Sequence, residues 1–326
     1  MPFRFKLAEP FEEACRRIGR EQIERAQIQL KSAGDPISAV HETRKSLKRL
    51  RALLHLVRPA LGDEAYRAEN ARLREVGHML SNARDRHVLV ETITKLEAVQ
   101  TIGRKSFAHA VRDALDSTNG GHSKTVEAAT IKQAQGLLGE ASRRFARLRL
   151  DGKGFEVVGA GLEASYRRGR RAFRHAYVEL TDEAFHEWRK DTQRHWRHMM
   201  LLSRAWSECL TARASAARSL SQVLGDDHDL ALLIAFLHSD RASGLGDEAA
   251  TGIEKLALHR QRELRALAQP MGQRLFAEGA RSLRRRMSAY WDAAVALKEH
   301  EPEEAPDGKK LTRTGARRRR TAVVRT

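Results

Sequence analysis

The chain is poor in cysteine, proline and uninterrupted apolar runs, and each scarcity excludes a class of protein. Its two cysteines, Cys15 and Cys209, exclude a disulfide framework and a multi-cysteine zinc site, so we expect both to pack as small hydrophobes in a reducing compartment. Seven prolines and 22 glycines are too few for a collagen or a turn-rich all-β protein. No apolar run reaches the roughly 18–20 residues of a membrane span, and the N-terminal residues do not resemble a secretory signal. We therefore expect a cytoplasmic protein that does not enter a membrane.

Positive charge, in contrast, is abundant. The 60 Lys and Arg residues exceed the 42 Asp and Glu residues and give a net charge of +18. Residues 308–326 hold eight basic side chains and no acidic one, so residues 1–307 keep a net charge of +10. Excess positive charge on a folded body concentrates anions around it. The expected partner is polyanionic: nucleic acid, an anionic membrane surface or polyphosphate.

The hydrophobic pattern predicts helices. Apolar residues recur at three- and four-residue spacing almost everywhere, and strand-like alternation is nearly absent. Breakers separate segments of roughly 20–35 residues, a usual length for bundle helices. The breakers lie at residues 34–36, 62–63, 119–121, 151–154, 244–247 and 269–270. Asp35 before Pro36, and Thr181 before two acidic residues, are typical helix starts. We predict an all-α protein, and at 41% hydrophobic residues it can bury a core.

An internal repeat divides the chain. The sequence VHETRK at Val40–Lys45 recurs as FHEWRK at Phe185–Lys190, and LSNARD at Leu80–Asp85 recurs as LGDDHD at Leu224–Asp229. Two matches in the same order at nearly one offset predict a duplication. The predicted halves are residues 1–151 and 152–300, followed by a basic tail, 301–326, that we expect to be disordered. Two antiparallel helical bundles related by a pseudo-twofold axis would bring equivalent faces onto a shared groove.

Each copy of the first motif predicts a cationic stripe on a helix. At about 100° per residue, the basic side chains fall near His41 in the first copy and near His186 in the second, with apolar residues opposite. In the second copy, Gln193 takes the place of Lys48. Arginine grips phosphate oxygens bidentately and lysine acts as a mobile point charge, so such a stripe suits successive phosphates. The candidate binding residues are His41, Arg44, Lys45, Lys48, Arg49, Arg51, His186, Arg189, Lys190, Arg194 and Arg197.

The ordinary explanation of one basic stripe is a solvated helix face. Its repetition in both halves, near a helix start each time, favours a binding site instead. Two further basic clusters, Arg170 with Arg171 and Arg284 with Arg285, are candidate secondary contacts or simply charged outer faces. The four tryptophans have aliphatic neighbours at helical spacing, so we expect them to pack in the core rather than to stack on bases.

These motifs resemble those of the CHAD family, the conserved histidine α-helical domain. The resemblance rests on His41-x-x-Arg44-Lys45 and its copy His186–Lys190, on Leu80–Asp85 and Leu224–Asp229, and on Gly161-x-x-x-x-Tyr166-x-x-Gly169-Arg170-Arg171, and it spans roughly residues 1–300. It implies two helical bundles around a basic central groove or pore that binds inorganic polyphosphate, and association with polyphosphate granules. It implies that the stripe residues above are the binders, with Arg49, Arg51 and Arg194 in supporting roles.

Two other functions are weaker alternatives. The His228-Asp229 pair resembles a metal-binding element of helical phosphohydrolases, but Arg84-Asp85 matches it in the other half, so we expect a helix cap or an ion pair there. Neither a CYTH-type Glu-x-Glu-x-Lys pattern nor a Walker phosphate loop is present, and we expect no cofactor, no metal and no catalysis. Nucleic-acid binding, directly or through the basic tail, remains the main alternative. An aromatic content of 6% and the lack of a recognisable reading motif disfavour it.

Overall fold

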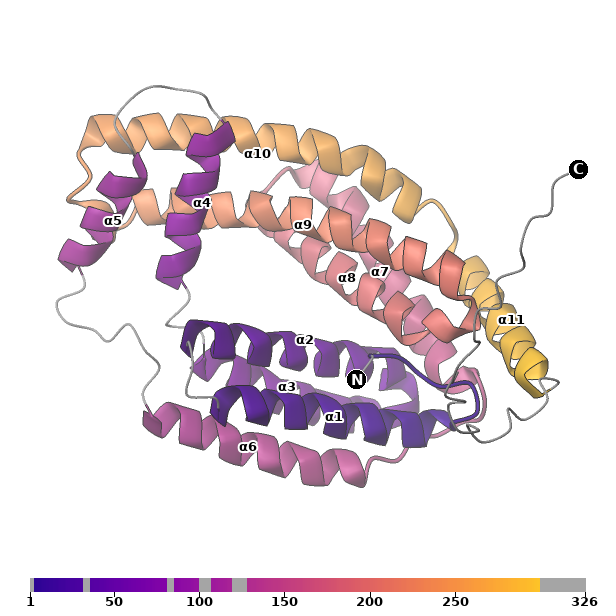
Figure 1. Cartoon of the computed structure of the whole chain (residues 1–326). Coiled ribbons are helices and arrows are strands. Elements are labelled where there is room, and N and C mark those ends of the chain that lie inside the picture. The colour runs from indigo at the N-terminus through magenta and orange to yellow at the C-terminus, as the bar shows by residue number, and fades with distance from the viewer. Residues whose placement is uncertain (1–2, 32–35, 81–84, 100–106, 119–127, 300–326) are drawn as a thin grey trace, which may run out of the picture.

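The computed structural model describes residues 3–31, 36–80, 85–99, 107–118 and 128–299, and these ranges are helical without a strand (Figure 1). The all-α prediction is therefore confirmed. The helices are α1 (Phe11–Lys31), α2 (Pro36–Leu61), α3 (Asp63–Met79), α4 (Asp85–Val99), α5 (Phe107–Thr118), α6 (Ala128–Ala146), α7 (Glu156–Glu179), α8 (Asp182–Leu201), α9 (Ser207–Leu237), α10 (Asp247–Leu275) and α11 (Ala280–Glu299). Short 3-10 turns lie at Ser203–Ala205 and Asp240–Ala242.

Most of the predicted breakers separate helices. Gly62, at φ 85°, joins α2 to α3, and the Thr181 hydroxyl accepts a hydrogen bond from the Ala184 amide at the start of α8 (3.3 Å). Pro270 is an exception, because α10 continues through it to Leu275. The prediction of a break there is wrong: α10 packs along α9, and this packing holds the helix together beyond the proline. Asp35 and residues 119–121 lie outside the described residues.

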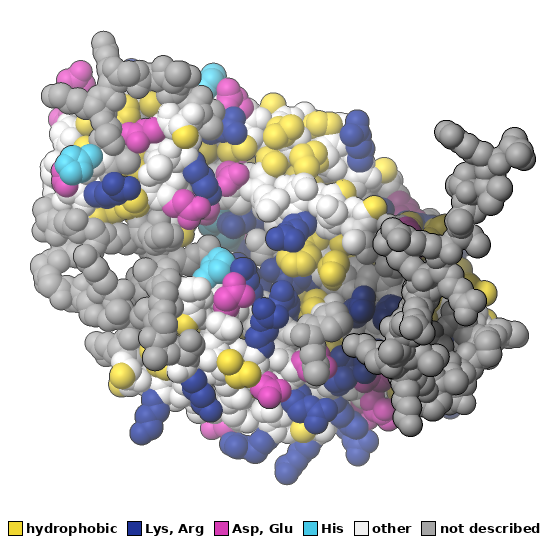
Figure 2. All heavy atoms as spheres, in the orientation of Figure 1, with side chains coloured by type: hydrophobic (Ala, Val, Ile, Leu, Met, Phe, Trp, Pro, Cys, Tyr) yellow, Lys and Arg dark blue, Asp and Glu magenta, His cyan; other side chains and the backbone are white. Residues whose placement is uncertain are grey.

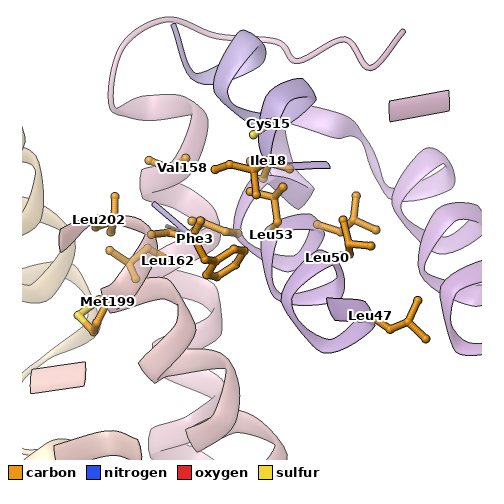
Figure 3. Packing of buried hydrophobic residues seen from close by; sticks show 14 of the residues in the cluster. Phe3, Cys15, Ile18, Leu47, Leu50, Leu53, Val158, Leu162, Met199 and Leu202 are labelled. Carbon is orange, nitrogen blue, oxygen red and sulfur yellow. The ribbon is translucent and has the colours of Figure 1, made fainter. Parts of the chain in front are cut away.

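The main core draws on both predicted halves. Helix α1 packs against α2 and α6, α2 packs against α7, and α7 packs against α8. Figure 3 shows side chains of α1, α2, α7 and α8 pointing into this common core. The closest approach is at Gly161 of α7, where an added Cβ would lie 1.8 Å from the Leu56 carbonyl oxygen of α2. Only glycine fits there, and the contact fixes α2 against the second half of the chain.

A second core lies at the other end of the molecule. Helices α4 and α5 cross the C-terminal half of α9 and the N-terminal half of α10 (Figure 1). Leu89, Ile93 and Val111 pack there with Leu233 and Ile253. Residues on both sides of the predicted boundary at 151 and 152 thus contribute to this core, and the division into two bundles stays a prediction. The repeated motif at Leu80–Asp85 lies largely outside the described residues.

The apolar faces predicted for α2 and α8 are buried. Leu50, Leu54 and Val57 of α2, and Trp188 of α8, have no exposed surface. Trp206 is an exception among the tryptophans: it is half exposed and packs edge-on against Tyr290. Within the described ranges, no helix combines the length and the apolar character that crossing a membrane requires. Because their apolar sides face the core, α2 and α8 present their basic sides elsewhere.

Candidate functional site

A cavity of about 650 Å³ lies among α2, α3, α8 and α9, and most of its lining is basic. The basic lining residues are Arg44, Lys48, Arg51 and His55 of α2, Arg74 of α3, His186, Arg189, Lys190, Arg194 and Arg197 of α8, and His228 of α9. Two carboxylates, Glu187 and Asp229, also line it. Figure 2 shows Lys and Arg side chains gathered in the hollow between the α8–α9 layer and the α1–α2 layer. The arrangement can hold several anionic groups at once.

The structure brings most of the predicted stripe residues together. Arg44, Lys48 and Arg51 of one stripe and His186, Arg189, Lys190, Arg194 and Arg197 of the other line the same cavity. Three predicted residues lie outside the lining. Lys45 is exposed and pairs with Glu42 (2.6 Å), whereas Arg49 turns toward α1 and donates to the Gln22 side chain (3.3 Å). His41, in the second turn of α2, is the third. That these residues bind a ligand stays a prediction.

The two stripes face each other because α2 and α8 are joined directly behind them. His198 of α8 is fully buried and its Nε2 donates to the Ala52 carbonyl of α2 (3.0 Å). Burial lowers the pKa of His198 to about 3, so the imidazole is neutral at pH 7. A neutral histidine can fill this site without adding another charge beneath the arginines.

Asp191 holds two arginines together beneath the cavity. Its carboxylate is 3% exposed and accepts from Arg168 of α7 (2.8 Å) and from Arg194 of α8. Burial, followed by the charges of Arg168 and Arg51, lowers the pKa of Arg194 to about 9. One carboxylate thus offsets two guanidinium groups, and Arg194 stays fixed at the cavity with unneutralised positive charge around it.

Arg197 is the most deeply buried cation of the lining, with 7% of its surface exposed. Its guanidinium stacks over the Trp196 ring (4.3 Å) and donates to the Gln193 carbonyl (2.7 Å). Its Nε has no hydrogen-bond partner, and no carboxylate of the described residues lies within 4.0 Å of the group. Burial, followed by the charge of Arg49, lowers its pKa to about 9. A buried cation without a counterion is costly in free energy, and a bound anion would remove that cost.

Two histidines pair at one wall of the cavity. The rings of His186 and His228 lie 4.0 Å apart, and the Nδ1 of His186 is buried without a partner. Burial, followed by its cationic neighbours, lowers the pKa of His186, and burial together with His186 lowers that of His228 to about 3. Both rings are neutral at pH 7 and can donate an N–H to a phosphate oxygen. A helix cap at the His228-Asp229 pair is wrong, because both residues lie in the interior of α9, with the His228 ring against His186. The alternative expectation, an ion pair, stays a prediction.

Helix α3 also lines the cavity, a contribution that no motif of the sequence predicts. Tyr66, Asn70 and Arg74 line the cavity at positions i, i+4 and i+8, so they share one face of the helix. Asn70 accepts from the Arg51 side chain (2.9 Å), and the Tyr66 hydroxyl contacts the His55 ring (3.1 Å). The spacing was the available signal, but a single tyrosine, asparagine and arginine carry no motif.

The secondary basic clusters lie elsewhere. Arg170 donates to the Phe276 carbonyl (3.0 Å), and Arg284 pairs with Glu163 (3.5 Å). Arg171 and Arg285 are exposed, and none of the four lines the cavity. Their contacts fit the charged outer faces of α7 and α11. Across the described ranges, no group of three or more His, Cys, Asp or Glu residues has an arrangement that could hold a metal ion.

Comparisons with known proteins identify the family and the fold. The model of the CHAD domain family matches residues 17–238, a range that includes both histidine motifs and the helices α2, α3, α8 and α9 that line the cavity. Among solved structures, PptA from Streptomyces chartreusis shares the fold, with a TM-score of 0.56, 15% sequence identity, and coverage of 83% of this chain and 100% of that chain. No curated protein matches the chain. Because the family match extends over more than half of the sequence, the protein belongs to the CHAD domain family.

Proposed function

We propose that the cavity binds inorganic polyphosphate and does not hydrolyse it. The observation that carries this proposal is the charge of the lining, in which eight arginine and lysine side chains from three helices face two carboxylates. With the histidines neutral, about six positive charges remain to match the negative charges of successive phosphates. Arg197, buried and without a carboxylate partner among the described residues, is the position where an anion gains most.

The chemistry of the lining also distinguishes between polyanions. Nucleic-acid sites combine cations with aromatic platforms on which bases stack. Apart from histidines, the lining contains a single aromatic residue, Tyr66, whose hydroxyl is engaged with His55. An inorganic chain has no bases and needs only charge and hydrogen-bond donors, which matches what the cavity offers. The CHAD resemblance, with polyphosphate as its implied ligand, supports the same assignment.

A charge-removal experiment tests the proposal. Replacement of Lys48, Arg189 and Lys190 with alanine removes three charges from the lining, whereas replacement of Arg67, Arg262 and Arg274 removes three from exposed positions outside it. By calorimetric titration, the lining variant should lose more than about tenfold in polyphosphate affinity. The slope of its log binding constant against log salt concentration should become less steep by about two. The exposed variant should bind nearly as the wild type does, and both should keep the wild-type circular dichroism.

Equal binding by the two variants would refute the cavity as the site. Duplex DNA and RNA serve as competitors at equal phosphate concentration. If either displaces polyphosphate, the protein is a nucleic-acid binder instead. Incubation with divalent metal should leave the polyphosphate chain length unchanged, and shortening of the chain would show catalysis. We also propose targeting to polyphosphate granules, which a fluorescent fusion would reveal as foci that the lining variant fails to form.

A further inference from the structure

Positive charge continues beyond the cavity along the seam between α1 and α2. Arg49 follows Lys48 in α2 but turns outward, where it donates to Gln22 of α1 (3.3 Å) and lies 6.0 Å from the Phe3 ring centre. Arg25 lies three residues after Gln22 on α1 and is exposed. Since i and i+3 positions share a helix face, Arg25 and Arg49 lie on the same side of the α1–α2 pair.

Arg218 of α9 adds charge near this seam, because it contributes to lowering the pKa of Arg49. It shares a helix face with Gly225, seven residues later, and with Asp229, eleven residues later. Asp229 lines the cavity, and Gly225 lies against the Arg189 side chain, 3.4 Å from an added Cβ. At 1.5 Å per residue, Arg218 is about 16 Å before Asp229 along the helix axis. It is exposed, so this face of α9 continues from the cavity to the surface.

Electrostatic interactions connect Arg25, Arg49 and Arg218 with Arg197 of the cavity lining. Burial, followed by the charge of Arg25 and with a further contribution from Arg218, lowers the pKa of Arg49. The charges of Arg49 and Arg218 also contribute to lowering the pKa of Arg197, which lines the cavity. Figure 2 shows dark blue side chains running along the boundary between the upper and lower layers. Arg197 is therefore the link between the cavity lining and the outer arginines.

Carboxylates neutralise little of this charge. Within the described part of the chain, Glu42 is the carboxylate nearest to Arg25, at 3.9 Å, and it also pairs with Lys45 at 2.6 Å. Arg49, Arg197 and Arg218 form no ion pair with a described residue. A row of cations from four helices, with one shared carboxylate, attracts anions and repels itself when empty.

We propose that Arg25, Arg49 and Arg218 form an outer track, a second binding segment that continues the cavity past Arg197. This rests on the proposed function and extends it: a polyphosphate chain too long for the cavity continues over the track. Short oligophosphates occupy the cavity alone. Affinity therefore rises with chain length because additional phosphates meet additional arginines, and the track is a determinant of chain-length preference.

The test compares two ligands on two matched variants. Arg25→Ala with Arg218→Ala removes two exposed charges of the track, and Arg262→Ala with Arg274→Ala removes two exposed charges from α10. The ligands are tripolyphosphate and long-chain polyphosphate, titrated by calorimetry at two salt concentrations. For the track variant, the Kd of the long chain should rise about tenfold and its salt slope should fall by about 1.4, with tripolyphosphate within about twofold of wild type. The α10 variant should match the wild type for both ligands.

Two results overturn the track. One is an unchanged long-chain Kd in the track variant, and the other is an equal loss for both ligands, which would reflect general charge rather than a distinct segment. Failure of the underlying function gives a different pattern. In that case the wild type does not bind tripolyphosphate, or the Lys48, Arg189 and Lys190 variant binds it as tightly as wild type. The two hypotheses are therefore separated by the short ligand.

Discussion

Replacement of Arg197 with methionine should make the free protein more stable and its binding of polyphosphate weaker. Arg197 is 7% exposed, and burial with neighbouring charges lowers the pKa of its guanidinium from 12.5 to about 9. At 1.36 kcal/mol per pKa unit, this difference is on the order of 5 kcal/mol. Because arginine stays protonated at neutral pH, the difference is the cost of keeping a charge buried and not a loss of that charge.

Two favourable contacts of Arg197 oppose that cost. The hydrogen bond to the Gln193 carbonyl contributes about 1 kcal/mol, and the stacking over Trp196 contributes about 1 kcal/mol. Methionine has a similar length and no charge, so it keeps part of the packing. We expect a net gain of about 1–3 kcal/mol in the free energy of unfolding, in the range found when buried charges are replaced by apolar groups of similar volume.

The assay is urea unfolding followed by circular dichroism at pH 7 in a buffer without phosphate, with and without tripolyphosphate. Without the ligand, the variant should unfold at higher urea concentration than wild type. With the ligand, the wild type should gain more stability than the variant, because the stabilisation by a ligand rises with the logarithm of its affinity for the folded state. Arg262→Met on the exposed face of α10 is the matched control. A variant less stable than wild type without ligand, or stabilised equally by it, would refute the reasoning.

Three further predictions concern the framework of the site, each measured by urea unfolding. Gly161→Ala should destabilise the fold by more than about 3 kcal/mol, because the added Cβ would overlap a backbone carbonyl of α2. The control Gly136→Ala, with open space around it, should stabilise the fold by about 1 kcal/mol. Equal effects of the two substitutions would contradict the close approach of α7 to α2. Asp191→Asn should cost about 3 kcal/mol by leaving the largely buried Arg194 and the partly exposed Arg168 without their carboxylate, and tripolyphosphate should restore part of the loss; an unchanged midpoint would refute this. His55 and His198 have native pKa values of about 2 and about 3, below the unfolded value of 6.5. Below pH 6.5 the unfolded state therefore binds more protons than the folded state, and the free energy of unfolding decreases as the pH is lowered. His55 and His198 should each cost about 2 kcal/mol at pH 5, beside the other histidines whose pKa burial lowers, and His55→Gln should reduce the wild-type decrease by its share of about 2 kcal/mol; a variant with the full wild-type decrease would exclude His55 as a source.

The faces of α2 and α8 could be predicted because helical periodicity is a local property. Every residue of an apolar stripe must face the core, so the opposite stripe had to face elsewhere, and the repeat indicated that two such stripes were related. Helical periodicity does not indicate how far along α2 the cavity extends. His41 and Lys45 share the angular sector of Arg44 and Lys48, but the α2 residues that line the cavity are Arg44, Lys48, Arg51, Ala52 and His55, so the cavity extends along only part of the helix.

Contacts between side chains of different helices could not be predicted from the sequence. The stack of His186 on His228 and the burial of Arg197 depend on how α8 and α9 pack, which the charge pattern of either helix does not contain. The breaker rule also failed at Pro270, where contacts with α9 outweigh the local preference of proline. In each case, tertiary packing overrides a signal that is correct for an isolated segment.

The second core, shared by α4 and α5 with α9 and α10, has a consequence for the protein's synthesis. Helices α4 and α5 leave the ribosome before α9 and α10, which supply the residues that cover Leu89, Ile93 and Val111. Until then we expect these side chains to be exposed to water and to other nascent chains, a state that favours aggregation. A fragment that ends after α6 would keep this apolar surface exposed, so we do not expect the two predicted halves, residues 1–151 and 152–300, to be soluble when they are expressed separately.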